Sequence, residues 1–288
     1  MGNQMLEVIT KEILDSEREN LRSFNQRNSK ETYTKNRVGE KRLMNCGEEC
    51  EIIGYNGALD IIVKFIRTGE LVRCTYNQFK KAEVKSHFIP SVYGVGIVGL
   101  ETIVDENGEV LKLYTTWKSM LQRCYSEKYH LKQPTYKGCT VCEEWLYYPN
   151  FKKWYEENYY EIKGQKMCLD KDILNKGNKV YSSENCVFVP QGVNILFIKN
   201  NASRGSLPIG VHWNKKNRKY QAQCNFFDVK NNEYKRKYLG LYNTPQEAFD
   251  AYKIAKEENV KQVAYHYKNQ IPKKLYEAMY RYEVCIDD

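Results

Sequence analysis

The sequence predicts an α+β protein built from several domains, and three observations support this. The chain has 288 residues, whereas single domains typically run to about 100–150. Short β-rich runs bounded by turn residues alternate with stretches in which apolar residues recur at helical spacing. These patterns divide the chain into a helical arm and linker (1–43), a small β-barrel (44–92), a central mixed module (93–203) and a sheet-plus-helix domain (204–288).

Apolar spacing and turn residues predict the first two domains. Residues 1 to about 26 carry Leu6, Ile9 and Ile13 among many charges, which indicates a weakly amphipathic helix. From residue 44 onward, the runs CEIIGY, LDIIVKFI and LVRCTY are separated by the turns NGA and TGE. This pattern indicates three strands of a small SH3-like barrel. We expect that barrel to be structural or to dock on DNA or on a protein partner.

The central module is predicted to begin with a hairpin and to continue with helices. ETIVDENGEVLKLY indicates a hairpin around Asn107-Gly108, and TTWKSMLQRCYS indicates a helix. In the next helix, NFKKWYEENYY, the side chains of Phe151, Trp154 and Tyr155 share one face and are predicted to be core. LDKDILNKGNKVYSSENCVFVP then indicates a strand, a turn and a second strand, followed by a short helix.

The last domain is predicted to contain three antiparallel strands and a long helix. The strands are IGVHWN, YQAQCNFF and EYKRKYLGLY. The helix opens with Thr244 as N-cap, Pro245 at its first position and Glu247 three residues after the cap, which is a complete capping box. Strand alternation predicts a buried side made by Val211, Ala222, Cys224, Leu239, Ala248, Phe249 and Tyr252.

The distribution of charge favours a nucleic-acid partner. The net charge is +9, and the segment from Arg204 to Gly240 holds nine Lys or Arg against only Asp228 and Glu233. Such a density suits a phosphate backbone, and a solvated hairpin face is the alternative. The sequence has no signal-peptide core and no run of about 18 apolar residues. We therefore expect a cytoplasmic protein with no membrane partner and with its ten cysteines reduced.

Two carboxylates, Asp170 and Asp172, lie where an apolar strand gives way to a turn rich in Lys, Gly and Asn. Hard cations such as Mg²⁺ or Mn²⁺ take oxygen ligands, usually including one or two protein carboxylates. A strand ending in Asp170, a second strand and a helix carrying Asn194 would form a ββα unit that brings a carboxylate and an amide oxygen onto one ion. The alternative is that the Asp residues only form Asx-type turns.

The segments TTWKSMLQRCYS, YKGCTVCEEW with NFKKW, and LDKDILNKGNKVYSSENCVFVP resemble the phage and bacterial HNH endonuclease family in order and spacing. The resemblance covers about residues 94 to 200 and implies a ββα-metal fold. It implies that Asp170 is the metal carboxylate, that Asn185 braces the loop and that Asn194 supplies a second ligand. The implied activity is divalent-metal-dependent cleavage or nicking of DNA.

The chain departs from that family at one position, because Lys171 stands where a His general base is usual. A lysine would need its pKa lowered far below about 10.4 to act as a base. Either Asp172 or a metal-bound water supplies the base, or His130 reaches in from the preceding loop, or cleavage is slow or absent. We prefer Asp172. The candidate catalytic set is Asp170, Lys171, Asp172 and Asn185.

A zinc site is a weaker prediction. Cys139 and Cys142 form one C-x-x-C, which is half of a tetrahedral zinc site, and no second pair is visible. Some nucleases that this module resembles carry a zinc held by four cysteines. We favour the alternative that these are small buried thiols.

The run IGVHWNKKNRKYQAQCNF, followed by KRKYLGLYNTPQEAFDAYKIAK, resembles the AP2 DNA-binding domain over about residues 207 to 262. In that family a helix backs a three-stranded sheet whose other face enters the major groove. Asn and Gln can read adenine there, and Arg can read guanine. Several arginines of the family are replaced here, so no target sequence is carried over. The predicted DNA-binding residues are His212, Asn214, Lys215, Lys216, Arg218, Gln223, Asn225, Arg236 and Tyr238.

An HNH module followed by an AP2 domain is the arrangement of phage-borne homing-type endonucleases. The resemblance therefore implies an enzyme that nicks or cuts double-stranded DNA, in the bacterial host cytoplasm if it is phage-encoded. One alternative is a sequence-specific DNA-binding protein whose nuclease site has decayed, which Lys171 suggests. Another is an interaction protein in host takeover or defence evasion that acts through the amino-terminal barrel.

Overall fold

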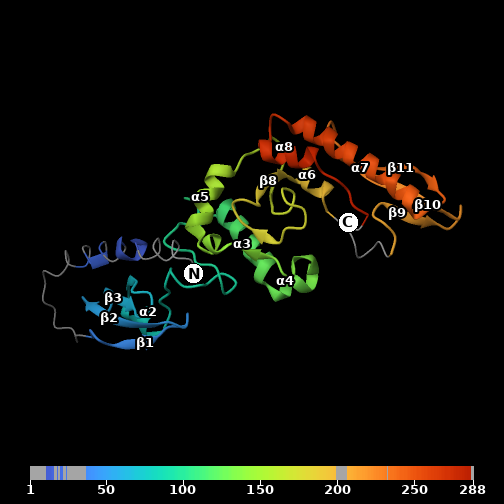
Figure 1. Cartoon of the computed structure of the whole chain (residues 1–288). Helices are drawn as coiled ribbons and strands as arrows, with labels where there is room; N and C mark the ends of the chain where they lie inside the picture. The colour runs from blue at the N-terminus through green and yellow to red at the C-terminus, as the bar shows by residue number, and fades with distance from the viewer. Residues whose placement is uncertain are drawn as a thin grey trace. The chain divides into compact units, whose positions relative to one another are not determined.

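The chain is a mixed α+β protein that divides into two compact units, Met1–Glu157 and Asn158–Asp288 (Figure 1). The computed structural model describes residues 11–15, 18, 20–21, 24, 37–198, 206–231 and 233–286. Most of the arm and linker predicted over 1–43 lies outside them. The unit boundary falls inside the range predicted for the central module, and the four-part division stays a prediction. Within the described ranges, no helix combines the length and apolar character needed to cross a membrane.

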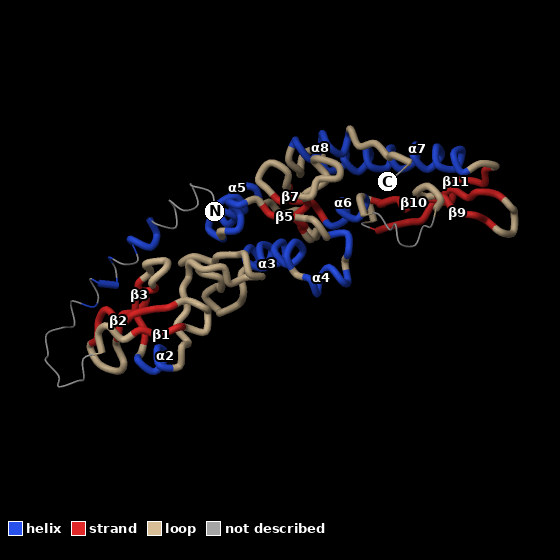
Figure 2. Tube along the Cα trace, turned by 60° about the horizontal axis from the view of Figure 1, so that its bottom comes forward, coloured by secondary structure: helices blue, strands red, loops and turns tan. Residues whose placement is uncertain are grey.

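An antiparallel sheet opens the first unit, and its strands follow one another in the order β1 (Lys41–Leu43), β2 (Glu49–Tyr55), β3 (Ile61–Phe65) and β4 (Leu71–Cys74). Figure 2 shows β1, β2 and β3 of this sheet close together. The three strands predicted from the sequence are confirmed as β2, β3 and β4. Helix α2 (Tyr76–Lys80) comes next, with Thr75 and Gln78 forming a reciprocal capping box.

The closed SH3-like barrel predicted over 44–92 is not observed among the described residues. Strands β1 and β4 are the two edges of an open sheet, and closure would require them to pair. Strand β1 has only three residues, all exposed, and after β4 the chain enters α2 instead of adding a strand. The sheet instead buries one face with α2, where Ile52, Val63 and Phe79 form part of the core. Its expected docking role stays a prediction.

The rest of the first unit is helical and rich in aromatic contacts. Its elements are α3 (Lys112–Tyr125), α4 (Glu127–Lys132), η1 (Pro134–Tyr136), β5 (Thr140–Val141), η2 (Glu143–Leu146) and α5 (Tyr148–Asn158). The predicted core residues Phe151, Trp154 and Tyr155 are buried. The predicted hairpin around Asn107-Gly108 is reduced to one bridge between the flanking valines.

In the second unit, a strand, a loop, a second strand and a helix follow one another. They are β6 (Met167–Asp170), a loop that contains β7 (Val180–Tyr181), β8 (Val187–Pro190) and α6 (Gln191–Leu196). Strands β6 and β8 pair antiparallel, with Asp170 opposite Val187. Alternation along β6 buries Met167 and Leu169 and leaves Asp170 half-buried at the strand end, where the turn begins.

The carboxy-terminal sheet has the order β11 (Glu233–Tyr242), β10 (Lys219–Asp228) and β9 (Val211–Asn214), all antiparallel. Helix α7 (Pro245–Tyr267) covers one face, and α8 (Lys273–Tyr280) packs against α7 (Figure 1). The capping box of Thr244 and Glu247 is confirmed. The predicted buried side is also confirmed, with Leu239 partly buried and the others buried: Val211, Ala222, Cys224, Ala248, Phe249 and Tyr252.

Candidate metal-binding turn and nucleic-acid interface

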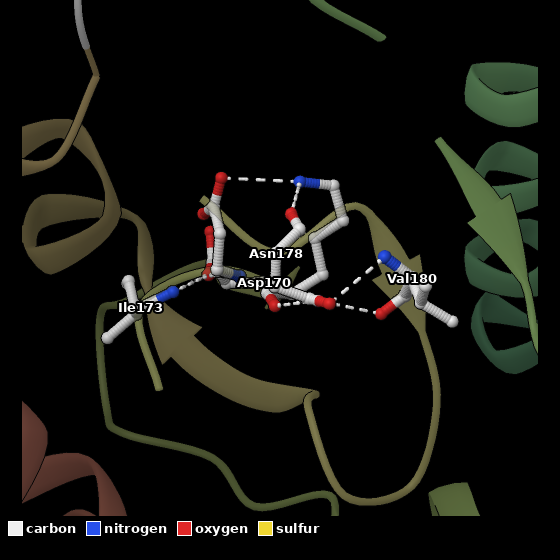
Figure 3. Close-up of polar contacts among 6 residues, drawn as sticks. Asp170, Ile173, Asn178 and Val180 are labelled. Carbon is white, nitrogen blue, oxygen red and sulfur yellow. Dashed lines mark hydrogen bonds and ion pairs between the residues drawn. The ribbon is translucent and has the colours of Figure 1, made fainter. Parts of the chain in front are cut away.

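The turn after β6 is built around the carboxylate of Asp170. Its Oδ1 accepts hydrogen bonds from the backbone N–H groups of Asp172 (2.9 Å) and Ile173 (2.8 Å) (Figure 3). This is the Asx-turn geometry that the sequence allowed as an alternative. It uses one carboxylate oxygen for the turn and holds the side chain in a fixed orientation at the strand end.

The electrostatic environment of Asp170 opposes its negative charge. Burial, as the larger cause, and the neighbouring carboxylate of Asp172 together raise the pKa of Asp170 to about 6, although the two backbone donors act against this rise. A carboxylate held beside another carboxylate in a partly buried turn is stabilised when a cation binds. Two carboxylates therefore share this turn with one ammonium, that of Lys171, which lies 3.2 Å from Asp172 Oδ2.

Lys171, which stands where the resembled family usually has a His base, is buried. Its Nζ donates to the backbone oxygen of Asn178 at 2.8 Å and lies 3.2 Å from Asp172 Oδ2. The same ammonium lies 5.9 Å from the ring centre of Tyr181. These contacts orient Lys171 toward the loop and give it a role in holding the loop closed.

Asn178 is a structural residue that the sequence analysis missed. Its Nδ2 donates to the backbone oxygens of Lys171 (2.6 Å) and Val180 (2.8 Å), and its Oδ1 accepts from Val180 N at 3.2 Å (Figure 3). Lys171 and Asn178 thus each bind the other's main chain, so that the two ends of the loop are tied together. The Asn-rich turn composition indicated a turn but not this partner.

Asn185 and Asn194, the two amides of the predicted site, lie on different elements. Asn185 precedes β8, and its Oδ1 accepts a hydrogen bond from Asn175 Nδ2 at 2.8 Å, which is the kind of contact that a loop brace requires. Asn194 is a half-buried residue of α6, the helix that directly follows β8. Across the described ranges, no cluster of three or more His, Cys, Asp or Glu is placed to hold a metal ion.

His130 and the cysteine pair belong to the first unit. The Nε2 of His130 lies 2.8 Å from the backbone oxygen of Arg123. Cys139 is buried, and burial raises the pKa of Cys142 to about 11. Because zinc binds thiolates, a protonated thiol must lose its proton before it can serve as a ligand.

The sheet face opposite α7 carries the predicted reading residues. Strand register places His212 opposite Gln221, Gln223 opposite Tyr238 and Asn225 opposite Arg236. The predicted residues of this face are all at least partly exposed: His212, Asn214, Gln223, Asn225, Arg236 and Tyr238. This face of the sheet therefore offers amide, imidazole, guanidinium and phenol groups to a ligand.

Asn214 also forms a hydrogen bond within the sheet, because its Nδ2 donates to Gln221 Oε1 at 2.8 Å. Its Oδ1 accepts from Asn217 N at 3.1 Å, which fixes the start of the β9–β10 turn. This turn carries Lys215, Lys216 and Arg218, all exposed. Over the described part of the chain, none of these three cations forms an ion pair. They are available to an anionic partner.

Comparison with protein-family models, with curated proteins and with solved structures found no match to the chain.

Proposed function

We propose that the protein is a divalent-metal-dependent DNA endonuclease that hydrolyses phosphodiester bonds at sites addressed by its carboxy-terminal sheet. The observation that carries the proposal is the carboxylate of Asp170, held at the end of β6 beside Asp172 in a strand, strand and helix element. The element follows the order that the HNH resemblance implies. The AP2-like sheet next to it in sequence supports DNA as the substrate.

The donor set fits Mg²⁺ or Mn²⁺. Asp170 and Asn194 offer hard oxygen ligands, and these cations are usually held by one or two protein carboxylates with water and substrate phosphate completing the shell. The ion would stabilise the charge that develops on the scissile phosphate and its leaving oxygen. Asp170 would bind it through the oxygen that the Asx turn leaves over, while Oδ1 keeps the carboxylate oriented.

Asp172 is the preferred general base. Its side chain is exposed, and it is adjacent to the proposed ligand Asp170. Its contact with Lys171 Nζ at 3.2 Å holds the carboxylate near the turn. In this arrangement Lys171 acts as a positioning residue for Asp172 and for the loop, and it does not act as the base.

DNA recognition is assigned to the sheet face. Arg236 and its cross-strand partner Asn225 suit guanine and adenine in the major groove. Replacing Arg236 with Ala should weaken specific binding by about 1–3 kcal/mol if it reads a guanine. A gel-shift titration against duplexes selected from a random-sequence pool would measure this loss. If Arg236→Ala bound selected and random duplexes with equal affinity, the substitution would have removed all sequence specificity.

A second candidate function is sequence-specific DNA binding without cleavage. The observation that favours it is the engagement of Lys171 with Asn178, which leaves the position of the usual base occupied by a structural cation. In that case the side chain of Asp170 would have a structural role alone, which is to form the Asx turn that follows β6. The sheet would have the same role in both functions.

Plasmid cleavage separates the two candidates. Supercoiled plasmid DNA that carries selected sites should be nicked or linearised by the wild-type protein with Mg²⁺ or Mn²⁺, and EDTA should stop the reaction. Asp170→Asn should lose cleavage and keep DNA binding, because the amide can still accept both turn hydrogen bonds. Cleavage that persists in EDTA would remove the metal assignment. Binding without cleavage under either metal would favour the second candidate.

A further inference from the structure

Helix α6, which carries the proposed ligand Asn194, packs directly on the sheet that carries the reading residues. A Cβ atom added to Gly192 would lie 2.5 Å from Phe227 Cζ, so the helix backbone touches the β10 ring at a distance that only glycine allows. The hydroxyl of Tyr234 on β11 donates to the backbone oxygen of Gly192. The ring centres of Phe227 and Tyr234 are 5.0 Å apart, and α6 packs against this pair of rings.

This contact belongs to one continuous core. Side chains from β8, α6, β10, α7 and α8 are buried in the same cluster, which includes Val189, Val193, Phe227, Val263 and Leu275. Asn259 of α7 adds a buried hydrogen bond, because its Oδ1 accepts from Phe227 N at 3.2 Å. Buried side chains at interior packing density resist relative movement of the elements that carry them.

The carboxy-terminal segment adds a second connection between the same parts. Lys176, in the loop after β6, donates to the backbone oxygen of Glu283 at 3.1 Å. Val284 next to it is buried in the core between the sheet and α7, and its N–H donates to Glu257 Oε1 at 2.8 Å. The loop that follows Asp170 is therefore bonded to the sheet domain at a point other than α6.

A groove of about 380 Å³ lies where α6 approaches the reading face. Ile195 and Ile198 line it, together with Gln223, Asn225 and Arg236 of the sheet. The predicted DNA-binding residues Gln223, Asn225 and Arg236 therefore lie beside the helix that carries the proposed metal ligand. A duplex bound on this face of the sheet would contact α6 as well.

We propose that the metal-bearing helix and the reading sheet act as one rigid body, so that the protein cuts at one fixed position within about one helical turn of the bases it reads, roughly 10 base pairs. This inference rests on the proposed endonuclease function and specifies its substrate geometry. Gly192 and Asn194 are two residues apart on α6, a rise of about 3 Å, and Gln223 and Phe227 are four residues apart on β10, about 13 Å. Even laid end to end, these two lengths span only about five base pairs at 3.4 Å each, well inside one helical turn.

A nuclease module joined to its reader only by a flexible segment gives a different product pattern. The tethered module would reach many phosphates, so its cuts would be spread over a range set by the length of the segment. A rigid pair selects a single phosphate on each strand that it attacks. The distribution of cut positions relative to the bound sequence therefore distinguishes the two arrangements.

The first experiment maps cuts on selected DNA. Duplexes are selected from a random-sequence pool with the full-length Asp170→Asn protein and sequenced to define the bound motif. The same duplexes are then incubated with the wild-type protein and Mn²⁺, and the ends are mapped by sequencing. One dominant position inside about one turn of the motif is expected. Positions scattered over several turns would overturn the rigid-body inference while leaving the endonuclease function intact.

A second experiment works without nuclease activity. The full-length Asp170→Asn protein also carries Cys285→Ser, which removes the exposed native thiol, and Ile195→Cys, which supplies a new one on α6. An iron chelate that cleaves DNA through hydroxyl radicals is attached to the new thiol. The matched control carries Ile254→Cys, at an exposed position of α7 on the opposite side of the sheet domain. The chelate at position 195 should cut the selected duplexes in one narrow window within about a turn of the motif, and the control should cut them weakly.

The two experiments separate failure of the inference from failure of the proposed function. If the chelate at position 195 cuts in one narrow window while the wild-type protein with Mn²⁺ cuts nothing, the rigid-body inference is supported and the proposed endonuclease function is rejected. Chelate cleavage that is equally broad from positions 195 and 254 would overturn the rigid body, whatever the nuclease result.

Discussion

Two partly buried carboxylates, Asp60 in the first unit and Asp170 in the second, have opposite surroundings. In the first unit, Asp60 accepts hydrogen bonds from Arg73 Nε at 2.5 Å and Nη2 at 2.6 Å, which is a matched bidentate pair. In the second unit, Asp170 lies beside the like charge of Asp172, and across the described residues it forms no ion pair. The first arrangement supports the fold, whereas the second retains an uncompensated charge that a cation would balance.

Glu70 extends the comparison within the first unit. It is buried, and it accepts hydrogen bonds from His87 N at 3.0 Å and from His87 Nδ1 at 2.5 Å, so its charge also has a partner. The hydrogen bond to Glu70 raises the pKa of His87 against the opposing effect of burial. Both of these carboxylates beside the sheet, Asp60 and Glu70, therefore have side-chain hydrogen-bond partners. Our proposal that Asp170 binds a cation predicts effects of opposite sign on stability when Asp60 and Asp170 are each replaced by Asn.

The largest effect on stability is expected from Asp60→Asn. This change removes the charged acceptor of two hydrogen bonds from Arg73, whose side chain is about a quarter exposed at 24%. The first unit should lose about 1.5–3 kcal/mol of unfolding free energy. Urea unfolding followed by circular dichroism measures the change.

Glu51→Gln is the matched control for that substitution. It removes a single longer contact with Lys41 on the same sheet, at 3.5 Å, in which the lysine is exposed, and should cost less than about 1 kcal/mol. Equal losses from Asp60→Asn and Glu51→Gln would show that the bidentate pair has no special stabilising role.

A smaller effect of opposite sign is expected from Asp170→Asn without metal. Asn keeps an oxygen that can accept from Asp172 N and Ile173 N, while the repulsion from Asp172 disappears. Thermal unfolding at about pH 8 should show a gain of about 1–2 kcal/mol. A loss of stability would mean that Asp170 is a turn former whose charge is favourable. Asp172→Asn should gain less, because it also gives up the contact with Lys171.

The pH dependence of this gain follows from the raised pKa. Folded Asp170 binds its proton up to about pH 6, whereas an unfolded Asp releases it near 3.8. The folded protein is therefore favoured by protonation at low pH, and this contribution is lost as the pH rises through the interval between those values. The difference in stability between wild type and Asp170→Asn should be small below the interval and constant above it. A difference that does not change with pH would exclude titration of Asp170 as its cause.

The smallest effect is expected at the cations that have no carboxylate partner. Lys216→Ala in the β9–β10 turn should lower DNA affinity similarly for all sequences and reduce the slope of log affinity against log salt by about 1. Fluorescence anisotropy over a series of salt concentrations measures both quantities. Lys64→Ala, at an exposed position of β3, is the control and should leave the slope unchanged. An unchanged slope for Lys216→Ala would remove this turn from the DNA contact.

Local patterns predicted most of the secondary structure. The capping box at Thr244 and the alternation that buries Val211 and Ala222 depend on residues close in sequence, and the structure has both. Closure of the expected barrel depends on pairing between its first and last strands, which no local pattern specifies, and that prediction was wrong.

The candidate site was only partly readable from the sequence. Asp170 could be selected from its place between strand and turn, but the mutual contacts of Lys171 and Asn178 involve main-chain oxygens that leave no sequence signal. The packing of α6 on the sheet depends on the contact between Gly192 and Phe227, which lies 35 positions further along the chain. A glycine inside a short helix was the one available sign of close packing.

The proposal that Asp170 is a metal carboxylate can be tested by titrating the protein with Mn²⁺ alone in a calorimeter. Wild-type protein and Asp60→Asn should each bind one Mn²⁺ per chain, with affinity that weakens as the pH falls through about 6, and Asp170→Asn should show no such binding. Equal Mn²⁺ binding by wild type and Asp170→Asn would contradict it.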